Sequence, residues 1–437
     1  MKKTAQLGPA TPPEGQPPWF GRLPPEWRSA PLRYLVTFSG GGTPDKGKPE
    51  YWNGTIPWVS PKDMKRDAIG ESEDHITEAA LDGTVVQLLP PQSVLVVVRG
   101  MILARTLPVA VTTKAVTINQ DIKALRCGPS LLPRFLQAVL QGQSHWLLSQ
   151  ADQSAHGTKK LETDVLRQFE TPRPSLKTQQ QVVSYLERET GRIDALIAAK
   201  EHLLDLLAEK QKALVASAVM RGLDSAVATR ATGVEWMPQA PAHWAPNRLG
   251  RLFRQSKALG FPDLTILSVY REYGVIERSA RDDNANRIPD DLEKYQLVEA
   301  GDLVINKMKA WQGSLGISNY QGITSPDYVV FRPTHREDPE FLHFLLRTQL
   351  LTTVYLSMSN GIRTGQWRIE PDRLVGLRIF LPPVTEQREI VDHISREAAK
   401  LERLRTATQL SLDLIRERRA ALIAAAVTGQ LDAGAAA

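Results

Sequence analysis

The 437-residue chain contains a single cysteine, Cys127. An intrachain disulfide needs two cysteines and a cysteine-based zinc site needs at least two, so the sequence excludes both. No run of about 18 apolar residues is present, and residues 1–18 are polar and rich in proline. We therefore expect a disordered N-terminal segment over 1–18, no membrane helix, no secretory signal and a reducing, cytoplasmic location.

Histidine is also scarce, and no two of the eight histidines lie three or four residues apart. Helical metal sites usually place their histidines at such spacings, so we expect no metal site in this chain. The length of the chain is too great for one hydrophobic core and predicts two to four domains.

A stretch of about 50 residues occurs twice, at 174–224 and 382–432, and the two copies align without a gap at a shift of 208 positions. Gln179 then falls on Gln387, and Leu223–Asp224 falls on Leu431–Asp432. An internal repeat of this length determines the architecture, because one structural unit has been used twice.

Both copies are typical of long helices, since apolar residues recur at three-, four- and seven-residue steps. The stripe is narrow and flanked by balanced charge, which favours a coiled-coil seam. About 44 residues would give a rod of roughly 65 Å. The compact segment between the copies favours antiparallel pairing; the alternative is two separate helices, each packed on its own domain. The predicted seam residues are Leu186, Ile193, Leu196, Leu203, Leu207, Leu214, Ile394, Leu401, Leu404, Leu412, Ile415 and Leu422.

The segments before the two helices share little sequence, but both contain short apolar runs bounded by Pro and Gly, as strands do. Each also contains one helical stretch, Leu131–Leu148 and Pro339–Ser357. We predict an α+β fold in which two domains with mixed sheets are separated by the antiparallel coil. The expected boundaries are 19–173 (first domain), 174–224 (central helix), 225–235 (linker), 236–381 (second domain), 382–432 (distal helix) and 433–437 (tail).

The formal net charge of +6 is confined to the domains, because the first helical copy carries seven basic and seven acidic residues and the second carries eight of each. A basic surface restricted to particular domains indicates a polyanionic ligand. Two-fold symmetric DNA readers bind two half-sites at a set spacing. Two different domains joined by a coil would accordingly read two different half-sites, with the coil as the spacer.

Several motifs resemble the specificity (S) subunit of type I restriction–modification systems. They include Gly42-Thr43-Pro44 with the following Tyr51-Trp52-Asn53-Gly54, Lys307-Met308-Lys309-Ala310-Trp311-Gln312-Gly313, and the repeated helix with Glu386-Gln387 at its start. The resemblance runs from Trp19 to Asp432. The first helix departs from the pattern, with Thr178-Gln179 in place of Glu-Gln.

This resemblance implies a non-catalytic DNA-binding subunit with two target-recognition domains that read a gapped, asymmetric sequence. It also implies two DNA adenine methyltransferase (M) subunits held by the paired helices, and restriction (R) subunits in the full complex. S-adenosylmethionine, ATP and Mg would be bound by those partners, and no cofactor by this chain.

The candidate DNA contacts are polar, basic and aromatic residues in or beside glycine-rich loops. Lys and Arg can hold phosphates, while Gln, Asn and Arg can read base edges. In the first domain they are Thr43, Lys46, Lys48, Trp58, Ser60, Lys62, Asn119, Gln120, Thr158, Lys159 and Lys160. In the second they are Arg271, Tyr273, Lys307, Lys309, Trp311, Gln312, Ser325, Tyr328, Arg363, Gln366 and Arg368. Core packing is the competing explanation for Trp58.

Enzymatic alternatives find little support. Gly42–Lys48 matches a phosphate-binding loop, but Pro49 replaces the hydroxyl that would hold magnesium. Asp45 with Asp63-Met64-Lys65 imitates a metal-dependent nuclease, yet Ser60-Pro61-Lys62 predicts a turn where a strand is required. A coiled-coil scaffold that binds protein remains the main alternative to a DNA reader, and the confinement of positive charge to the domains argues against it.

Overall fold

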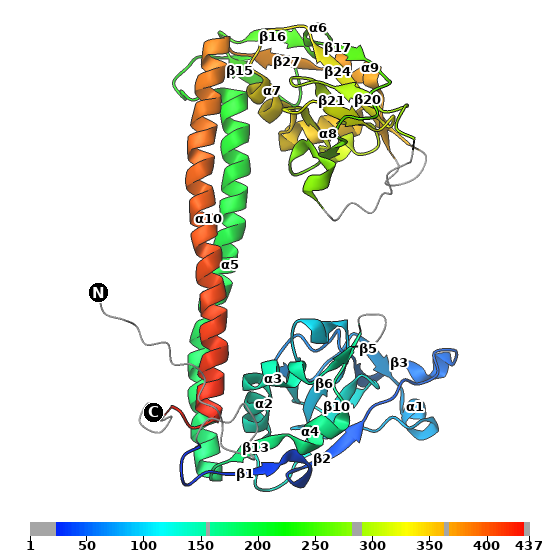
Figure 1. Cartoon of the computed structure of the whole chain (residues 1–437), viewed down its shortest axis with the longest axis vertical. Helices are drawn as coiled ribbons and strands as arrows, with labels where there is room; N and C mark the ends of the chain where they lie inside the picture. Colours follow the sequence, from blue (N-terminus) through cyan, green and yellow to red (C-terminus); the bar gives the residue numbers. More distant parts are fainter. Residues whose placement is uncertain (1–22, 154–157, 282–290, 362–366, 432–437) are drawn as a thin grey trace, which may run out of the picture. The chain divides into compact units, whose positions relative to one another are not determined.

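The computed structural model describes residues 23–153, 158–281, 291–361 and 367–431. The chain divides into two compact units, Met1–Glu201 with Leu410–Ala437, and His202–Gln409. Two long helices, α5 (Leu176–Arg221) and α10 (Val384–Val427), each contribute one part to each unit (Figure 1). The segments 1–18 and 433–437, predicted to be disordered and a loose tail, lie outside the described residues.

The first unit is built on a five-stranded sheet of order β2-β10-β6-β8-β4, in which only β4 and β8 pair in parallel. A three-stranded sheet, β5-β3-β9, adds a second parallel pair, β3 with β9. The elements are β1 (Arg28–Pro31), η1 (Leu32–Tyr34), β2 (Val36–Gly40), η2 (Pro49–Tyr51), β3 (Trp52–Val59), β4 (Ala68–Ile69), β5 (Asp74–Ile76), α1 (Glu78–Gly83), β6 (Val94–Val97), β7 (Arg99–Gly100), η3 (Met101–Ala104), β8 (Val109–Thr112), β9 (Thr117–Ile118), β10 (Ile122–Cys127), α2 (Pro133–Gly142), α3 (Ser144–Ser149), β11 (Asp152–Gln153), β12 (Lys159–Lys160), α4 (Thr163–Gln168) and β13 (Glu170–Arg173).

The second unit is built on a four-stranded antiparallel sheet of order β17-β24-β21-β22. The predicted linker 225–235 contains β14, which pairs with β15. The elements are β14 (Thr229–Ala231), β15 (Gln239–Pro241), β16 (Ala245–Arg248), α6 (Leu249–Leu252), β17 (Phe253–Ser256), β18 (Leu267–Tyr270), β19 (Gly274–Glu277), η4 (Arg278–Ala280), β20 (Gln296–Val298), β21 (Leu303–Asn306), η5 (Ala310–Gln312), β22 (Leu315–Ile317), β23 (Gly322–Thr324), β24 (Tyr328–Pro333), α7 (Pro339–Leu346), α8 (Gln349–Ser357), β25 (Ser359–Asn360), β26 (Arg368–Ile369), α9 (Pro371–Val375) and β27 (Arg378–Leu381).

The predicted α+β class with two long helices is therefore confirmed. The helical stretches predicted as Leu131–Leu148 and Pro339–Ser357 each form two helices, α2 with α3 and α7 with α8. The first break follows Gly142, where Gln143 leaves the helical conformation with φ −106° and ψ 15°. Among the described residues, none of the helices is long and apolar enough to cross a membrane.

Each domain is closed by the same antiparallel pair of strands, one entering the domain and one leaving it. In the first unit β1 pairs with β13, and in the second unit β16 pairs with β27. A Pro-x-x-Trp turn precedes each entering strand: Trp27 N–H donates to the Pro24 carbonyl (2.9 Å), and Trp244 N–H donates to the Pro241 carbonyl (3.0 Å). The segments Pro24–Trp27 and Pro241–Trp244 thus start both domains with the same local geometry.

A fully buried glutamine joins each domain to the helix that follows it. Gln179 accepts a hydrogen bond from the Leu132 N–H (2.8 Å) at the start of α2 and donates to the carbonyls of Ser130 and Pro174 (3.0 Å each). Gln387, at the matching repeat position, accepts from the Asp338 N–H (2.8 Å) at the start of α7. Its amide also donates to the Pro382 carbonyl (2.9 Å).

We expect the change Gln179→Ala to lower the free energy of unfolding of the first unit by about 2–4 kcal/mol, because it leaves buried N–H and C=O groups without their partner. The measurement is urea unfolding of the full chain. Gln180→Ala is the matched control, since Gln180 is exposed on the same helix, and it should cost about 0.5 kcal/mol or less. Equal losses for the two variants would contradict this role of Gln179.

The two helices run antiparallel within each unit. In the first unit the Arg419 Nε donates to Asp194 Oδ1 (2.7 Å) and an Arg416 guanidinium nitrogen donates to Glu201 Oε1 (2.6 Å), so numbering rises on α5 as it falls on α10. In the second unit the end of α5, at Val219, shares one hydrophobic cluster with Ile390 near the start of α10.

The seam differs from the predicted one at three positions: Leu196, Leu203 and Leu404 are 47%, 42% and 55% exposed. The other predicted seam residues are buried or half-buried. On α5 the covered positions follow alternating steps of four and three residues, which is the heptad pattern. These positions are 186, 190, 193, 197, 200, 204, 207, 211, 214 and 218. Three of them hold the polar residues Thr190, Lys200 and Gln211, and choosing neighbouring leucines instead selected the exposed Leu196 and Leu203.

Candidate nucleic-acid interface

A cationic cavity of about 400 Å³ opens in the second domain. Its walls come from β17, β20, β24 and β26 and from the residues that follow β21. Four cationic side chains face one carboxylate in this lining, so the cavity favours an anion. The lining residues are Gln255, Lys257, Lys294, Gln296, Lys307, Pro326, Tyr328, Val329, Arg368, Glu370 and Pro371.

Lys307 is one of these cations. Its Nζ donates to the Pro326 carbonyl (3.1 Å), a neutral acceptor. Burial lowers the pKa of Lys307, and the positive charges of Arg368 and Lys257 lower it further. A bound phosphate would reverse the effect of these neighbours by balancing their charge. The backbone holds the site together, since the Ile369 N–H donates to the Lys307 carbonyl (3.0 Å).

Three predicted contacts, Lys307, Tyr328 and Arg368, thus meet in one cavity. Tyr328 is half-buried, and burial raises the pKa of its hydroxyl, so this group is a neutral donor at physiological pH. Ser325 lies at the rim, where its carbonyl accepts from Gln296 Nε2 (3.4 Å).

The turn η5 presents the other predicted residues of the motif. Lys309 and Gln312 are exposed, whereas Trp311 packs edge-on against Trp367 with ring centroids 5.2 Å apart. The Trp311 indole N–H donates to the Met308 carbonyl (3.0 Å), so this ring shapes the loop.

The remaining predictions in this domain lie on the turn between β18 and β19 or cannot be placed. Arg271 forms an ion pair with Glu272 (2.9 Å), and Tyr273 is exposed and covered on one ring face by Arg281 (5.4 Å). Arg363 and Gln366 lie outside the described residues.

In the first domain the glycine-rich loop is joined to the segment after β9. Thr43 Oγ1 donates to Gln120 Oε1 (2.5 Å), and the Trp58 indole N–H donates to the Gly42 carbonyl (2.9 Å). Trp58 is buried against Trp52, with ring centroids 5.2 Å apart, so its side chain belongs to the core. Lys46 and Lys48 are exposed on the same loop.

Several predicted polar contacts are occupied within the domain. The Ser60 hydroxyl and N–H both donate to Asp63 Oδ2 (2.8 and 2.9 Å), forming the turn expected at Ser60–Lys62. Buried Asn119 donates to Asp121 (3.1 Å). Lys62 lies 2.9 Å from both Glu73 and Asp74, which raise its pKa. In this conformation these three residues stabilise the loops that carry the exposed cations.

Lys159 and Lys160 form β12, which pairs with β7. Lys160 also forms an ion pair with Glu162 (2.5 Å). The Leu161 N–H donates to the Val98 carbonyl (2.8 Å), just as the Ile369 N–H donates to Lys307. Leu161 and Ile369 are separated by the repeat shift of 208, so β12 in the first domain and β26 in the second occupy corresponding places. Thr158 is half-buried immediately before β12.

Comparison with known proteins finds similarity to one family over part of the chain. Residues 24–204 match the family described as type I restriction modification DNA specificity domain. The chain is 35% identical over 164 residues to the EcoR124I/EcoR124II specificity subunit of Escherichia coli, which covers 37% of this chain and 40% of that protein. It is 27% identical over 194 residues to the MjaIX specificity subunit of Methanocaldococcus jannaschii, which covers 43% and 42%.

The matched stretches thus span about two fifths of the length of these curated relatives. The fold similarity is wider: a chain from a solved type I R-M system has a TM-score of 0.66 and covers 94% of this chain and 100% of its own, at 14% identity. This likeness establishes a shared fold along nearly the whole chain.

Sequence reasoning did not select several residues that lie beside the candidate interface. Arg99 and Gly100 pair with Lys160 and Lys159, and Met101 beyond them is 74% exposed. In the second domain, Lys257 and Lys294 complete the cavity. A usable signal for the first group was the Arg-Gly-Met sequence that follows Val98, the residue whose place after β6 corresponds to that of Lys307 after β21.

The enzymatic alternatives gain no geometric support from the described residues. Asp45 lies in a turn and accepts from the Gly47 N–H (2.9 Å), while Asp63 accepts from Ser60. Within the described part of the chain, no group of three or more His, Cys, Asp or Glu side chains is arranged to hold a metal ion.

Proposed function

We propose that this chain is the DNA-recognition subunit of a type I restriction–modification complex and has no catalytic role of its own. Each domain would read one part of a gapped, asymmetric DNA sequence. The observation that carries this proposal is the cationic cavity around Lys307 and Arg368. Its place in the second domain corresponds to that of Val98 and Lys160 in the first, as the shared backbone hydrogen bond shows.

The coil would set the spacing between half-sites and dock two DNA adenine methyltransferase (M) subunits, with R subunits joining in the full complex. Exposed leucines support docking, because Leu196 with Leu404 and Leu206 with Leu414 are exposed at matching repeat positions. Large apolar side chains in water favour a protein partner. S-adenosylmethionine, ATP and Mg would be bound by those partners, and the chain itself would bind no cofactor.

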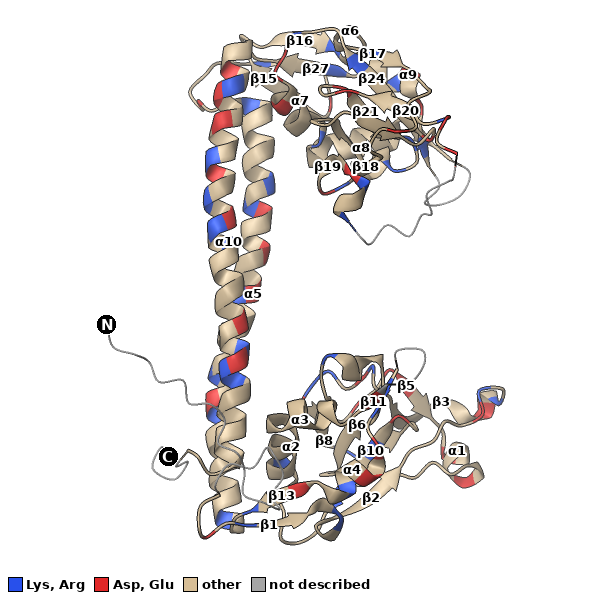
Figure 2. Ribbon diagram, in the orientation of Figure 1, with Lys and Arg blue, Asp and Glu red and all other residues tan. Residues whose placement is uncertain are grey.

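The alternative function, a coiled-coil scaffold that binds protein through its domains, accounts less well for the charge distribution. Four cations around one cavity are costly without a polyanion, since like charges repel. A DNA reader requires such a site for phosphates. The helices carry many charges of both signs (Figure 2), and their sequence repeats are neutral overall.

The purified chain should bind duplex DNA with an affinity that falls steeply and linearly, on logarithmic axes, as the salt concentration rises. The chain alone should modify nothing, and together with its M subunit it should direct methylation to one gapped sequence. The measurement is mapping of methylated adenines in a host that expresses both proteins. Uniform methylation, or methylation by the chain alone, would contradict the proposal.

A further inference from the structure

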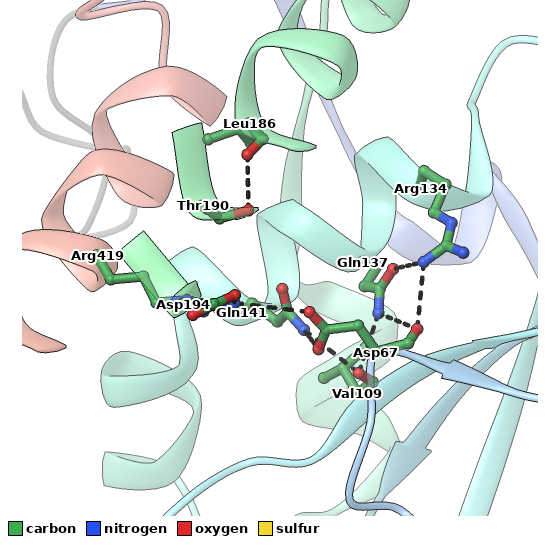
Figure 3. Close-up of polar contacts among 9 residues, drawn as sticks. All are labelled: Asp67, Val109, Arg134, Gln137, Gln141, Leu186, Thr190, Asp194 and Arg419. Atoms are coloured by element: carbon green, nitrogen blue, oxygen red, sulfur yellow. Dashed lines mark hydrogen bonds and ion pairs between the residues drawn. The ribbon is translucent and has the colours of Figure 1, made fainter. Parts of the chain in front are cut away.

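Arg419 is a charged residue at a seam position of α10, where it meets carboxylates from two other elements. Its guanidinium forms two hydrogen bonds with Asp194 of α5 (2.7 and 3.1 Å) and lies 3.7 Å from Asp67 Oδ2 (Figure 3). The Arg419 side chain is 26% exposed, so these interactions are less screened than those of a fully exposed pair.

Asp67 is in turn fixed by the first domain. Its carboxylate accepts from Gln141 Nε2 of α2 (2.8 Å), and its carbonyl accepts from Gln137 Nε2 (2.7 Å) and from the Val111 N–H of β8 (3.0 Å). Asp67 is therefore shared between α2, the main sheet and the coil (Figure 3). These groups line a small cavity of about 80 Å³ between α2 and the helices.

The segment that ends at Asp67 begins at Ser60 and carries Lys62, both candidate DNA contacts. Asp63 holds the start of this segment, because it accepts from Ser60 and from the Glu73 N–H (3.0 Å). The end of the segment is held by α2 and by Arg419. The ion pair between Arg419 and Asp67 would thus transmit a displacement of α10 in this unit to the segment 60–67.

The second unit attaches its domain to the coil by a different contact. Glu386, at the start of α10, accepts from the Trp244 indole N–H (3.1 Å) and pairs with His243 (2.7 Å). The matching residue in the first helix is Thr178, which has no carboxylate and instead bonds Ser175 (2.8 Å). Conversely, the position that matches Arg419 in the repeat is Gln211, which carries no charge.

We propose that Arg419 is a positioning residue that anchors the segment 60–67 of the first domain to the coil, in place of the carboxylate contact used in the second unit. This inference rests on the proposed function, in which the anchor would hold the first half-site at a fixed distance from the coil. The first unit lacks the carboxylate contact, because Thr178 stands where the second helix has Glu386. The contact of Arg419 with Asp67 takes its place.

The first test follows hydrogen exchange in the full chain and does not depend on DNA binding. Arg419→Ala should speed exchange of amides in the segment 60–70 by about threefold to fivefold. Arg416→Ala is the matched control, because Arg416 forms ion pairs with Glu201 and Asp413, which both lie on the helices. Equal exchange in this segment for both variants would overturn the anchor.

Two further variants separate an anchor from a general loss of stability. Asp67→Asn keeps the acceptor for Gln141 but loses the ion pair, so it should accelerate exchange as much as Arg419→Ala does. The double variant should add little to either single change, since both remove one interaction. Additive effects would show that the two residues act separately and would overturn the proposal.

The second test uses the assembled methyltransferase complex and a set of substrates with different gap lengths. Arg419→Ala should broaden the range of gaps that is methylated while the recognised bases stay the same, and Arg416→Ala should leave the range unchanged. An unchanged range for Arg419→Ala would overturn the positioning role. Failure of the proposed function itself would appear differently, as absent sequence-specific methylation by the unaltered complex.

Discussion

Reversing two charges of the second-domain cavity, with Lys307→Glu and Arg368→Glu combined, should weaken DNA binding by the full chain by about 100-fold or more at physiological salt. Both cations line one cavity, and the Lys307 Nζ donates to a carbonyl, which is a neutral acceptor. The change removes two favourable charges and adds two repulsive ones beside the phosphates. Each lost phosphate contact should also lower the slope of log affinity against log salt by about 0.9.

The control for this prediction is Lys210→Glu with Lys212→Glu. Both lysines are exposed on α5, so the pair changes the net charge equally without altering the cavity. Affinity should then fall only modestly, through the weaker long-range attraction of a less basic chain. If the two double variants lose the same affinity, net charge rather than the cavity governs binding. Neutral single variants, Lys307→Gln and Arg368→Gln, should each cost about tenfold.

The long helices were predictable because their signal is redundant. A repeat without gaps, an uninterrupted apolar stripe and neutral overall charge all indicate the same structure. Which face of each helix forms the seam was harder to predict. Lys200 and Gln211 occupy half-buried seam positions, and their long side chains can cover apolar surface while keeping their polar ends in water. A rule that counts only apolar residues passes over them and selects Leu196 and Leu203.

Sequence motifs identified several residues of the candidate site. They did not show which of these residues meet in the fold or are free to contact DNA. Lys307, Tyr328 and Arg368 come from three separate segments, and their meeting depends on how β21, β24 and β26 are arranged in the fold. Whether a polar side chain is free to contact DNA depends on its neighbours within the domain. Lys62 is paired with two carboxylates and Ser60 with Asp63, and no local pattern in the sequence distinguishes them from exposed Lys46.

The glycine-rich motif Gly42–Lys48 is a case in which a local sequence pattern suggests a structure that the chain does not form. Its spacing imitates a phosphate-binding loop, but the folded loop runs through a turn, with the Lys48 N–H donating to the Asp45 carbonyl (3.2 Å). Lys48 lies over the ring of Tyr51, 5.1 Å from its centroid. The turn is not followed by the long helix whose N-terminus binds phosphate in nucleotide-binding proteins, since only the three-residue η2 comes next.

A deletion of one heptad from the coil should shorten the recognised gap without changing the recognised bases. The segment Leu203–Glu209 of α5 is seven residues long and would leave the stepping of the seam in phase, because the heptad is preserved. The antiparallel helices also require a matching deletion in α10. If Ala218 and Ile394, which belong to one hydrophobic cluster, are taken as facing positions, Arg403–Gln409 lies opposite Leu203–Glu209.

Removing both segments would shorten the coil by about 10 Å, since each residue adds 1.5 Å. At about 3.4 Å per base pair, the preferred gap should fall by about three base pairs. The measurement is methylation of substrates with graded gaps by the assembled complex. A five-residue deletion at the same two places is the control: it breaks the heptad phase, so it should reduce methylation at every gap. Changed bases after the seven-residue deletion would mean that the coil takes part in reading the sequence and does more than space the two domains.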